Sequence, residues 1–230
     1  MRLLIAIVTC HKYANRADEQ RRTWVPEAKA LGIDVVFFIG RGEGAIPEDT
    51  VQLDVPDDYH SLPLKVQEMF RWADERKYDF VMKTDDDVLV HPDRLLQQIR
   101  PRTEYMGHSN GRYASGFAYV VSQQAVATIA RAVWDNDPSE DKWVGGVLSK
   151  AFRIEDNPYF IIYRFQLGYR CRGHWRGSIN GWEICPQCKC IGQNASVICP
   201  NNTTTWVEKL YKDYKEKQGV YNDSQRRNTH

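Results

Sequence analysis

Three consecutive aspartates, Asp85, Asp86 and Asp87, follow one apolar run and stand directly before another. Residues 80–82 are Phe, Val and Met, and residues 88–90 are Val, Leu and Val. Adjacent carboxylates repel one another unless a cation neutralises them, and a cluster of oxygen ligands suits Mg²⁺ or Mn²⁺. The pattern therefore predicts either a divalent-cation site at the end of a buried strand or a solvated acidic turn.

Apolar runs alternate with helical patterns from the N-terminus to residue 134. We expect strands at residues 3–9, 33–39, 51–55, 78–84 and 113–122, and helices at residues 15–31, 61–75, 92–99 and 123–134. This alternation predicts an α/β fold with a mostly parallel sheet. Ligands of such sheets bind at the carboxyl ends of the strands, and the three aspartates follow such an end.

The charge of the chain is unevenly distributed. Residues 1–159 hold 20 Lys and Arg against 25 Asp and Glu, whereas residues 160–230 hold 11 against 5. The character of the sequence also changes near residue 159, after which aromatic residues and five of the six cysteines follow. We therefore expect an α/β core at residues 1–158 and a separate basic, aromatic, Cys-rich region at residues 159–230 that ends in a mobile tail.

No apolar run approaches the roughly 18 residues of a membrane span, so we expect no membrane association. Residues 3–9 are apolar but too short for a secretion signal, and no small-residue cleavage site follows them. The expected location is the cytoplasm. If the cysteines form disulfides, the alternative is a lumenal or secreted protein.

Four segments, taken in order, resemble the beta-1,3-galactosyltransferase and Fringe-type family. They are Arg16 with residues 21–24 (Arg-Arg-Thr-Trp), residues 83–87 (Lys-Thr-Asp-Asp-Asp), the glycine-containing strand at residues 113–122, and residues 139–145 (Ser-Glu-Asp-Lys-Trp-Val-Gly). The resemblance implies a GT-A fold, which is Rossmann-like. It also implies a metal-dependent, inverting glycosyltransferase that takes its sugar from a nucleotide diphosphate, with a UDP-sugar as the expected donor and a saccharide or glycoconjugate as the acceptor.

The resemblance also implies roles for the acidic residues. Asp85 and Asp87 would hold Mn²⁺ or Mg²⁺, and Asp86 would face the ribose of the nucleotide. Asp141 would be the general base that takes the proton of the acceptor hydroxyl, which fits its place at a predicted helix start. The alternative is that Glu140 and Asp141 simply begin a helix.

Further donor and acceptor residues follow from the same resemblance. Arg21, His11 and Lys83 are candidate donor-binding residues, and for Arg21 a structural ion pair is the alternative. Gly116 lies on the strand that would form the floor of the acceptor site. The sequence departs from the family at Lys142, where an apolar residue is usual, and throughout its C-terminal third.

The C-terminal third contains two candidate metal-binding features. The family often supplies a late histidine to its metal, and His174 is the candidate here. Cysteines at a Cys-x-x-Cys-x-Cys spacing predict a structural Zn²⁺ site, with two disulfides as the alternative that four Asn-x-Ser/Thr sites favour. The predicted zinc ligands are Cys185, Cys188, Cys190 and Cys199, with Cys171 or His174 as substitutes.

Basic and aromatic residues alternate in the same region. Arg172, Trp175 and Arg176 are candidate acceptor-binding residues, and such a surface suits phosphates and unstacked bases. Two alternatives therefore stand beside the saccharide acceptor. One is a DNA glycosyltransferase that acts on a hydroxymethylated base. The other is a non-catalytic nucleic-acid-binding protein on a transferase scaffold.

Overall fold

The structure is a computed structural model that describes residues 1–163, 169–171, 174–176, 197–200, 211–212 and 215. Within residues 161–163, 169–171, 174–176 and 197–200 the description covers the backbone. Among the described residues, no helix is long and apolar enough to cross a bilayer.

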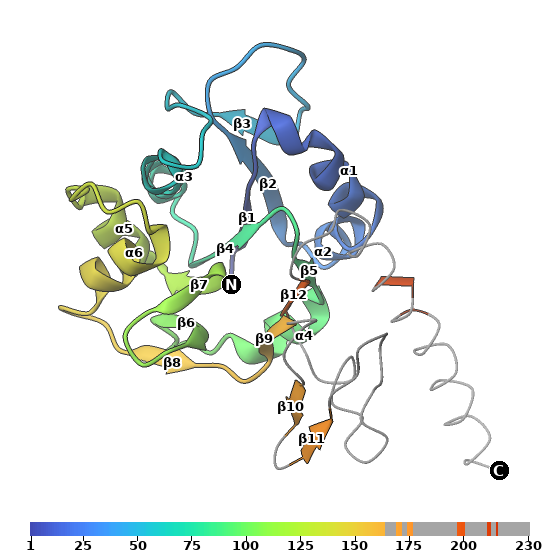
Figure 1. Ribbon diagram of the computed structural model, residues 1–230, viewed down its shortest axis with the longest axis vertical. Coiled ribbons are helices and arrows are strands. Elements are labelled where there is room, and N and C mark those ends of the chain that lie inside the picture. Colours follow the sequence, from blue (N-terminus) through green and yellow to red (C-terminus); the bar gives the residue numbers. More distant parts are fainter. Residues whose placement is uncertain (164–168, 172–173, 177–196, 201–210, 213–214, 216–230) are drawn as a thin grey trace.

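A seven-stranded mixed sheet forms the centre of the protein (Figure 1). Its strands, in spatial order, are β3 (Thr50–Gln52), β2 (Asp34–Ile39), β1 (Leu3–Val8), β4 (Phe80–Asp85), β7 (Ala114–Ser122), β6 (Tyr105–Ser109) and β8 (Ile154–Asp156). The first four are mutually parallel, β7 is antiparallel to both β4 and β6, and β8 is parallel to β6. The α/β fold predicted from the alternating pattern is confirmed.

Helices cover both faces of this sheet, and the strands supply alternate side chains to each face. Leu3, Ile5 and Ile7 of β1 pack into one core cluster, while Leu4, Ala6 and Val8 pack into the other. The first cluster is covered by α1 (Ala14–Arg22), α2 (Val25–Ala30) and α4 (Pro92–Gln98). The second is covered by α3 (Leu62–Glu75), α5 (Gln123–Arg131) and α6 (Glu140–Leu148), which Figure 1 shows together on one side of the sheet.

A smaller sheet joins the C-terminal region to the core. Its strands, in order, are β5 (Leu89–Val90), β12 (Val197–Pro200) and β9 (Phe160–Tyr163), and Val197 pairs with Val90. A hairpin of β10 (Tyr169–Cys171) and β11 (His174–Arg176) lies between β9 and β12 in the sequence. Because β5 begins two residues after Asp87, the small sheet pairs the backbone of β12 with the segment that follows the triple aspartate.

The segment expected to be one helix at residues 15–31 is two helices. Thr23 leaves the helical conformation at φ −107° and ψ −98°, and its hydroxyl donates to the carbonyl of Glu19 at 2.8 Å. Pro26 follows in the first turn of α2, where its missing N–H costs nothing. The break lets the Trp24 side chain turn fully into the core. A short 3-10 helix, η1 (His11–Tyr13), precedes α1.

Candidate functional site

The carboxyl ends of β1 and β4 meet at one edge of the sheet. Val8 lies opposite Asp85 in the parallel pairing of these strands, so Thr9 and the triple aspartate leave the sheet side by side. The Thr9 hydroxyl donates to Asp86 Oδ2 at 2.7 Å. Asp86 is 6% exposed, so it faces the protein rather than solvent.

Arg16, on α1, is the cation next to Asp86 and Asp87. Its Nη1 donates to Asp86 Oδ1 at 3.2 Å and lies 3.6 Å from Asp87 Oδ2. The guanidinium also lies over the ring of Tyr13, 4.0 Å from its centroid. Sequence reasoning named Arg16 within a motif but gave it no role. The motif gives no sign of this contact because 70 residues separate Arg16 from Asp86.

Lys83 is the cation next to Asp85. Its Nζ donates to Asp85 Oδ1 at 2.6 Å and to the Gly116 carbonyl, and it lies 3.5 Å from Glu140 Oε2. The side chain is 1% exposed. The Lys83 ammonium therefore contacts protein carboxylates, and in this arrangement it is not accessible to a sugar nucleotide.

All three aspartate carboxyls have raised pKa values. Burial, followed by repulsion from Asp85 and Asp86, raises the pKa of Asp87 to about 6 even though Arg16 opposes the shift. Burial is also the main reason that the pKa values of Asp85 and Asp86 are raised, and Lys83 and Thr9 respectively oppose it. This cluster therefore holds more buried negative charge than its two neighbouring cations fully stabilise.

The carboxylate oxygens of the triple aspartate fit a divalent cation that binds together with a diphosphate. Within the described part of the chain, no three His, Cys, Asp or Glu side chains converge as a metal-binding group. Lys83 draws Asp85 to one side, and Arg16 draws Asp86 and Asp87 to the other. Mg²⁺-type sites, however, commonly use one or two carboxylates and complete their octahedron with water and substrate phosphates. Asp85 and Asp87 suffice for such a site.

Glu140 and Asp141 begin α6 but have different surroundings. Glu140 is 3% exposed, accepts a hydrogen bond from the Tyr119 hydroxyl, and faces Lys83. Asp141 is partly exposed, and its Oδ1 accepts a hydrogen bond from the backbone N–H of Lys142 at 2.9 Å. A buried, paired Glu140 cannot reach an acceptor, whereas Asp141 retains an accessible carboxylate.

Gly116, the predicted acceptor-site residue, lies against this pair. A Cβ atom on Gly116 would lie 3.1 Å from Glu140 Oε2 and 3.4 Å from Asp141 Cβ. β7 and the start of α6 therefore approach closely at this position. The structure thus brings together Lys83, Asp85, Gly116 and Asp141, which the sequence placed in three separate motifs.

Arg21 lies away from the aspartates. Its guanidinium donates to Asp49 Oδ1 from both Nε (3.1 Å) and Nη2 (2.7 Å), and to Asp18 at 2.9 Å. It also lies over the Phe37 ring at 4.1 Å. These contacts correspond to the structural ion pair that was the alternative to phosphate binding.

His11 lies where the loops after β1 and β2 meet. Its backbone N–H donates to Asp57 Oδ2 at 2.7 Å, and its ring Nε2 is 3.3 Å from the Gly40 carbonyl. Asp57 also accepts from Gly40 N at 2.7 Å and from Lys65 Nζ at 2.5 Å. A Cβ on Gly40 would lie 2.7 Å from the Pro56 carbonyl, so only glycine allows this approach. Sequence reasoning missed Asp57, which follows β3, and Lys65 of α3; together they join the segments that follow β1, β2 and β3.

Residues 15–109 match the sequence model of the family described as "Galactosyltransferase". Beta-1,3-galactosyltransferase 1 of Mus musculus is 30% identical over 148 residues, which cover 57% of this chain and 43% of that protein. The resemblance to the beta-1,3-galactosyltransferases is confirmed. A probable beta-1,3-galactosyltransferase 13 of Arabidopsis thaliana is 31% identical over 112 residues, 40% of this chain and 32% of that one. The chain thus spans less than half the length of these galactosyltransferases.

A solved structure supports the fold over a longer stretch. A glycosyltransferase involved in the glycosylation of the major capsid of PBCV-1 superposes with a TM-score of 0.55 at 15% identity, covering 92% of this chain and 100% of that one. The GT-A fold that the galactosyltransferase resemblance implied is confirmed.

Several predicted residues lie outside what the structure describes. Arg172, Cys185, Cys188 and Cys190 fall outside the described residues altogether. For four more, the backbone alone is described. These are His174, Trp175 and Arg176 of β11, and Cys199 of β12. The late metal histidine, the zinc ligands and the basic acceptor surface therefore stay predictions.

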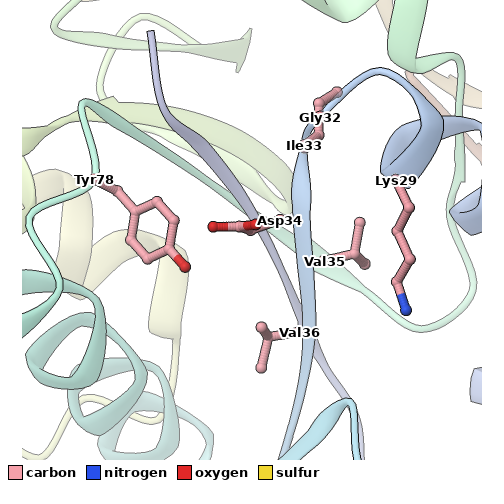
Figure 2. Close-up of a pocket in the computed structure, with 7 residues that line it drawn as sticks. All are labelled: Lys29, Gly32, Ile33, Asp34, Val35, Val36 and Tyr78. Atoms are coloured by element: carbon pink, nitrogen blue, oxygen red, sulfur yellow. The ribbon is translucent and has the colours of Figure 1, made fainter.

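The pocket drawn in Figure 2 lies at the opposite edge of the sheet. It has a volume of about 470 Å³ and is lined by the end of α2, the first half of β2 and Tyr78, which precedes β4. Tyr78 and Asp34 face each other across it (Figure 2). Because these residues lie at the amino ends of β2 and β4, the pocket is separate from the triple-aspartate site at the carboxyl ends.

Proposed function

We propose that this chain transfers a sugar from a nucleotide diphosphate to a hydroxyl group of a saccharide or glycoconjugate. The observation that carries the proposal is the arrangement at the carboxyl edge of β4. Three adjacent carboxylates follow the strand, with Asp86 buried and Asp85 and Asp87 partly exposed, and Asp141 lies next to Gly116 of the neighbouring strand β7. The names of the similar proteins make galactose the first sugar to test, and the family resemblance makes its UDP form the expected donor.

The residues have distinct roles in the proposed reaction. The acceptor oxygen forms a bond to the anomeric carbon of the donor, and its proton passes to the Asp141 carboxylate. The bond from the anomeric carbon to the diphosphate breaks, and its electron pair stays on the phosphate oxygen. Asp85 and Asp87 would hold Mn²⁺ or Mg²⁺, which stabilises the charge that develops on a departing diphosphate. Inversion at the anomeric carbon is implied by the family resemblance.

A donor and acceptor screen tests the proposal directly. The full chain is incubated with Mn²⁺, a panel of sugar nucleotides and a panel of saccharides, and products are identified by mass spectrometry. We expect one sugar to be added to an acceptor, and the product to disappear with EDTA. Thermal shift with the same donors separates the proposal from a non-catalytic scaffold. A chain that neither binds any sugar nucleotide nor forms a product in Mn²⁺ contradicts it.

The DNA acceptor stays an alternative prediction, because the basic and aromatic side chains that motivate it are not described. It predicts donor-independent DNA binding that weakens steeply with salt, since each neutralised phosphate releases counterions. A gel-shift series across salt, with an Arg170, Arg172 and Arg176 triple Ala variant, separates it from a free saccharide acceptor. Binding that is undetectable near physiological salt excludes DNA.

A structural Zn²⁺ on the C-terminal cysteines also stays a prediction. Elemental analysis of protein purified without added metal should find about one Zn²⁺ per chain. Cys188→Ser should then lose the metal. A mass four hydrogens below that of the reduced chain would instead support two disulfides, and with them a lumenal or secreted location.

A further inference from the structure

We infer that Arg16 binds the diphosphate of the donor and stabilises it as the leaving group. The inference rests on the proposed function and adds a residue to it. Arg16 is paired with Asp86 and with Asp87, and Asp87 is a carboxylate that a divalent cation would also neutralise. When that cation is bound, the guanidinium becomes available to an anion at the same place.

The contacts of Arg16 leave much of its donor capacity unused. A guanidinium has five N–H donors. The hydrogen bond to Asp86 comes from Nη1 at 3.2 Å. Within the described residues, Nε is buried and has no hydrogen-bond partner. Since a buried donor without a partner is costly, a rearrangement that gives Nε an acceptor is favourable. A phosphate can accept two hydrogen bonds from one arginine, one from Nε and one from a terminal nitrogen.

The position of Arg16 suits an incoming anion. The side chain is 21% exposed, so a ligand can reach it, yet it is sufficiently enclosed for a charged hydrogen bond to be strong. The Tyr13 ring holds the guanidinium plane on one face. Asp87 Oδ2 is 3.6 Å from Nη1, so a diphosphate bound through a cation on Asp87 would be near the guanidinium.

The two other cations that the sequence offered for donor binding are engaged in ion pairs with protein carboxylates. Lys83 is 1% exposed and lies between Asp85 and Glu140. Arg21 is held by Asp49 and Asp18. Arg16 is thus a partly accessible cation in direct contact with Asp87, one of the two carboxylates that the proposal assigns to the metal.

The chemistry gives Arg16 a role without a proton transfer. As the bond between the anomeric carbon and the diphosphate breaks, its electron pair collects on the phosphate oxygen. Arg16 stays protonated throughout, because an arginine cannot be deprotonated in a protein, and it donates hydrogen bonds to the phosphate oxygens. Hydrogen bonds that strengthen as charge develops lower the barrier rather than only tightening binding.

The test compares Arg16→Ala and Arg16→Lys with Arg22→Ala, which removes an exposed arginine from the same helix. Mn²⁺ affinity without nucleotide and UDP affinity at saturating Mn²⁺ are measured by calorimetry, and kcat is measured with the best donor. Arg16→Ala should bind Mn²⁺ at least as tightly as the unchanged chain, because a cation beside the carboxylates is removed. UDP affinity should fall about 10–100-fold, and kcat should fall too. Arg16→Lys should restore only part of the loss.

Unchanged or tighter Mn²⁺ binding together with weaker UDP binding in Arg16→Ala identifies Arg16 as a diphosphate-binding residue. If UDP binding strengthens together with Mn²⁺, Arg16 only neutralises the aspartates and the inference is wrong. If UDP binding is unchanged, or if Mn²⁺ and UDP binding fall together with the melting temperature, it is also wrong. The unchanged chain is the check on the proposed function. If it binds no UDP in Mn²⁺, that proposal fails first. If it binds UDP and Arg16→Ala binds UDP equally well, only the inference about Arg16 fails.

Discussion

Lys83 and Glu140 form an ion pair of 3.5 Å between Nζ and Oε2, with both side chains nearly excluded from solvent at 1% and 3% exposure. The pair joins the strand that carries the triple aspartate to the helix that carries Asp141. Burial alone would lower the pKa of Lys83, but Asp85 and Glu140 outweigh it and raise that pKa, so the amine stays charged. The geometry of the site therefore depends on one buried lysine.

Replacing Lys83 by methionine should destabilise the fold. It would leave Glu140 and Asp85 without their cation, and breaking a buried pair on one side costs about 3–5 kcal/mol. Urea unfolding measures the loss, and Lys150→Met, at an exposed position, is the control. In a double-mutant cycle, Lys83→Met with Glu140→Gln should cost less than the two single changes summed. Additive losses would show that the two residues are not coupled.

Asp87→Ala should abolish metal-dependent binding of the donor and leave the fold intact. Asp87 is a proposed metal ligand whose burial beside Asp85 and Asp86 is unfavourable, so the protein does not need it for stability. Its loss should weaken Mn²⁺ binding by more than the roughly 10–100-fold typical of removing an outer-sphere partner. Calorimetry with UDP, with and without EDTA, measures this, and Asp93→Ala on α4 is an exposed control. Equal UDP affinity in all conditions would refute the metal assignment.

Asp141→Asn should slow the reaction and spare donor binding. The amide has nearly the same size and still accepts a hydrogen bond from the N–H of Lys142, but it cannot take a proton from the acceptor. Removing a general base costs about 10²–10⁴ in rate. The comparison needs kcat with a saturating acceptor and UDP affinity from the same protein batch. Near-normal turnover would mean that another residue is the base.

Local sequence pattern was enough to predict the strands that build the site. β1 is a continuous apolar run, β2 is apolar after Asp34, and β4 begins with three apolar residues before Lys83, Thr84 and Asp85. The strand at Tyr105–Ser109 was missed because its last three residues, Gly, His and Ser, carry no strand signal. Its place is set by pairing with β7 and β8.

The partners of the charged residues could not be predicted from spacing. Lys65 reaches the carbonyl of Thr9, 56 residues away, and Arg16 reaches Asp86, 70 residues away. A Lys-x-Asp motif alone does not distinguish a lysine that contacts a ligand from one that is a buried counterion. Only the proximity of Glu140, set by the packing of α6 on β7, decides in favour of the counterion.

His91, which directly precedes α4, should make stability depend on pH. Burial, followed by repulsion from Arg94 and Lys215, lowers the pKa of His91 to about 3, and the residue is 1% exposed. In the unfolded chain a histidine titrates near pH 6.5, roughly the model-peptide value. The unfolded state therefore binds the proton first, so the contribution of His91 to stability is complete above that pH. It is lost as pH falls from 6.5 toward 3, by up to ~1.4 kcal/mol per pH unit.

His91→Asn should therefore flatten the fall in unfolding free energy between pH 6.5 and pH 4. Urea unfolding at several pH values gives the slope for each protein, and His60→Asn, at an exposed histidine, is the matched control. Asp87 titrates in the same range with the opposite sign, because its folded pKa is raised and its protonation favours folding as pH falls below about 6. The contribution of Asp87 is the same in the unchanged chain and in His91→Asn, so it cancels when the two slopes are subtracted. Parallel slopes for the unchanged chain and His91→Asn would mean that His91 is not kept neutral by burial.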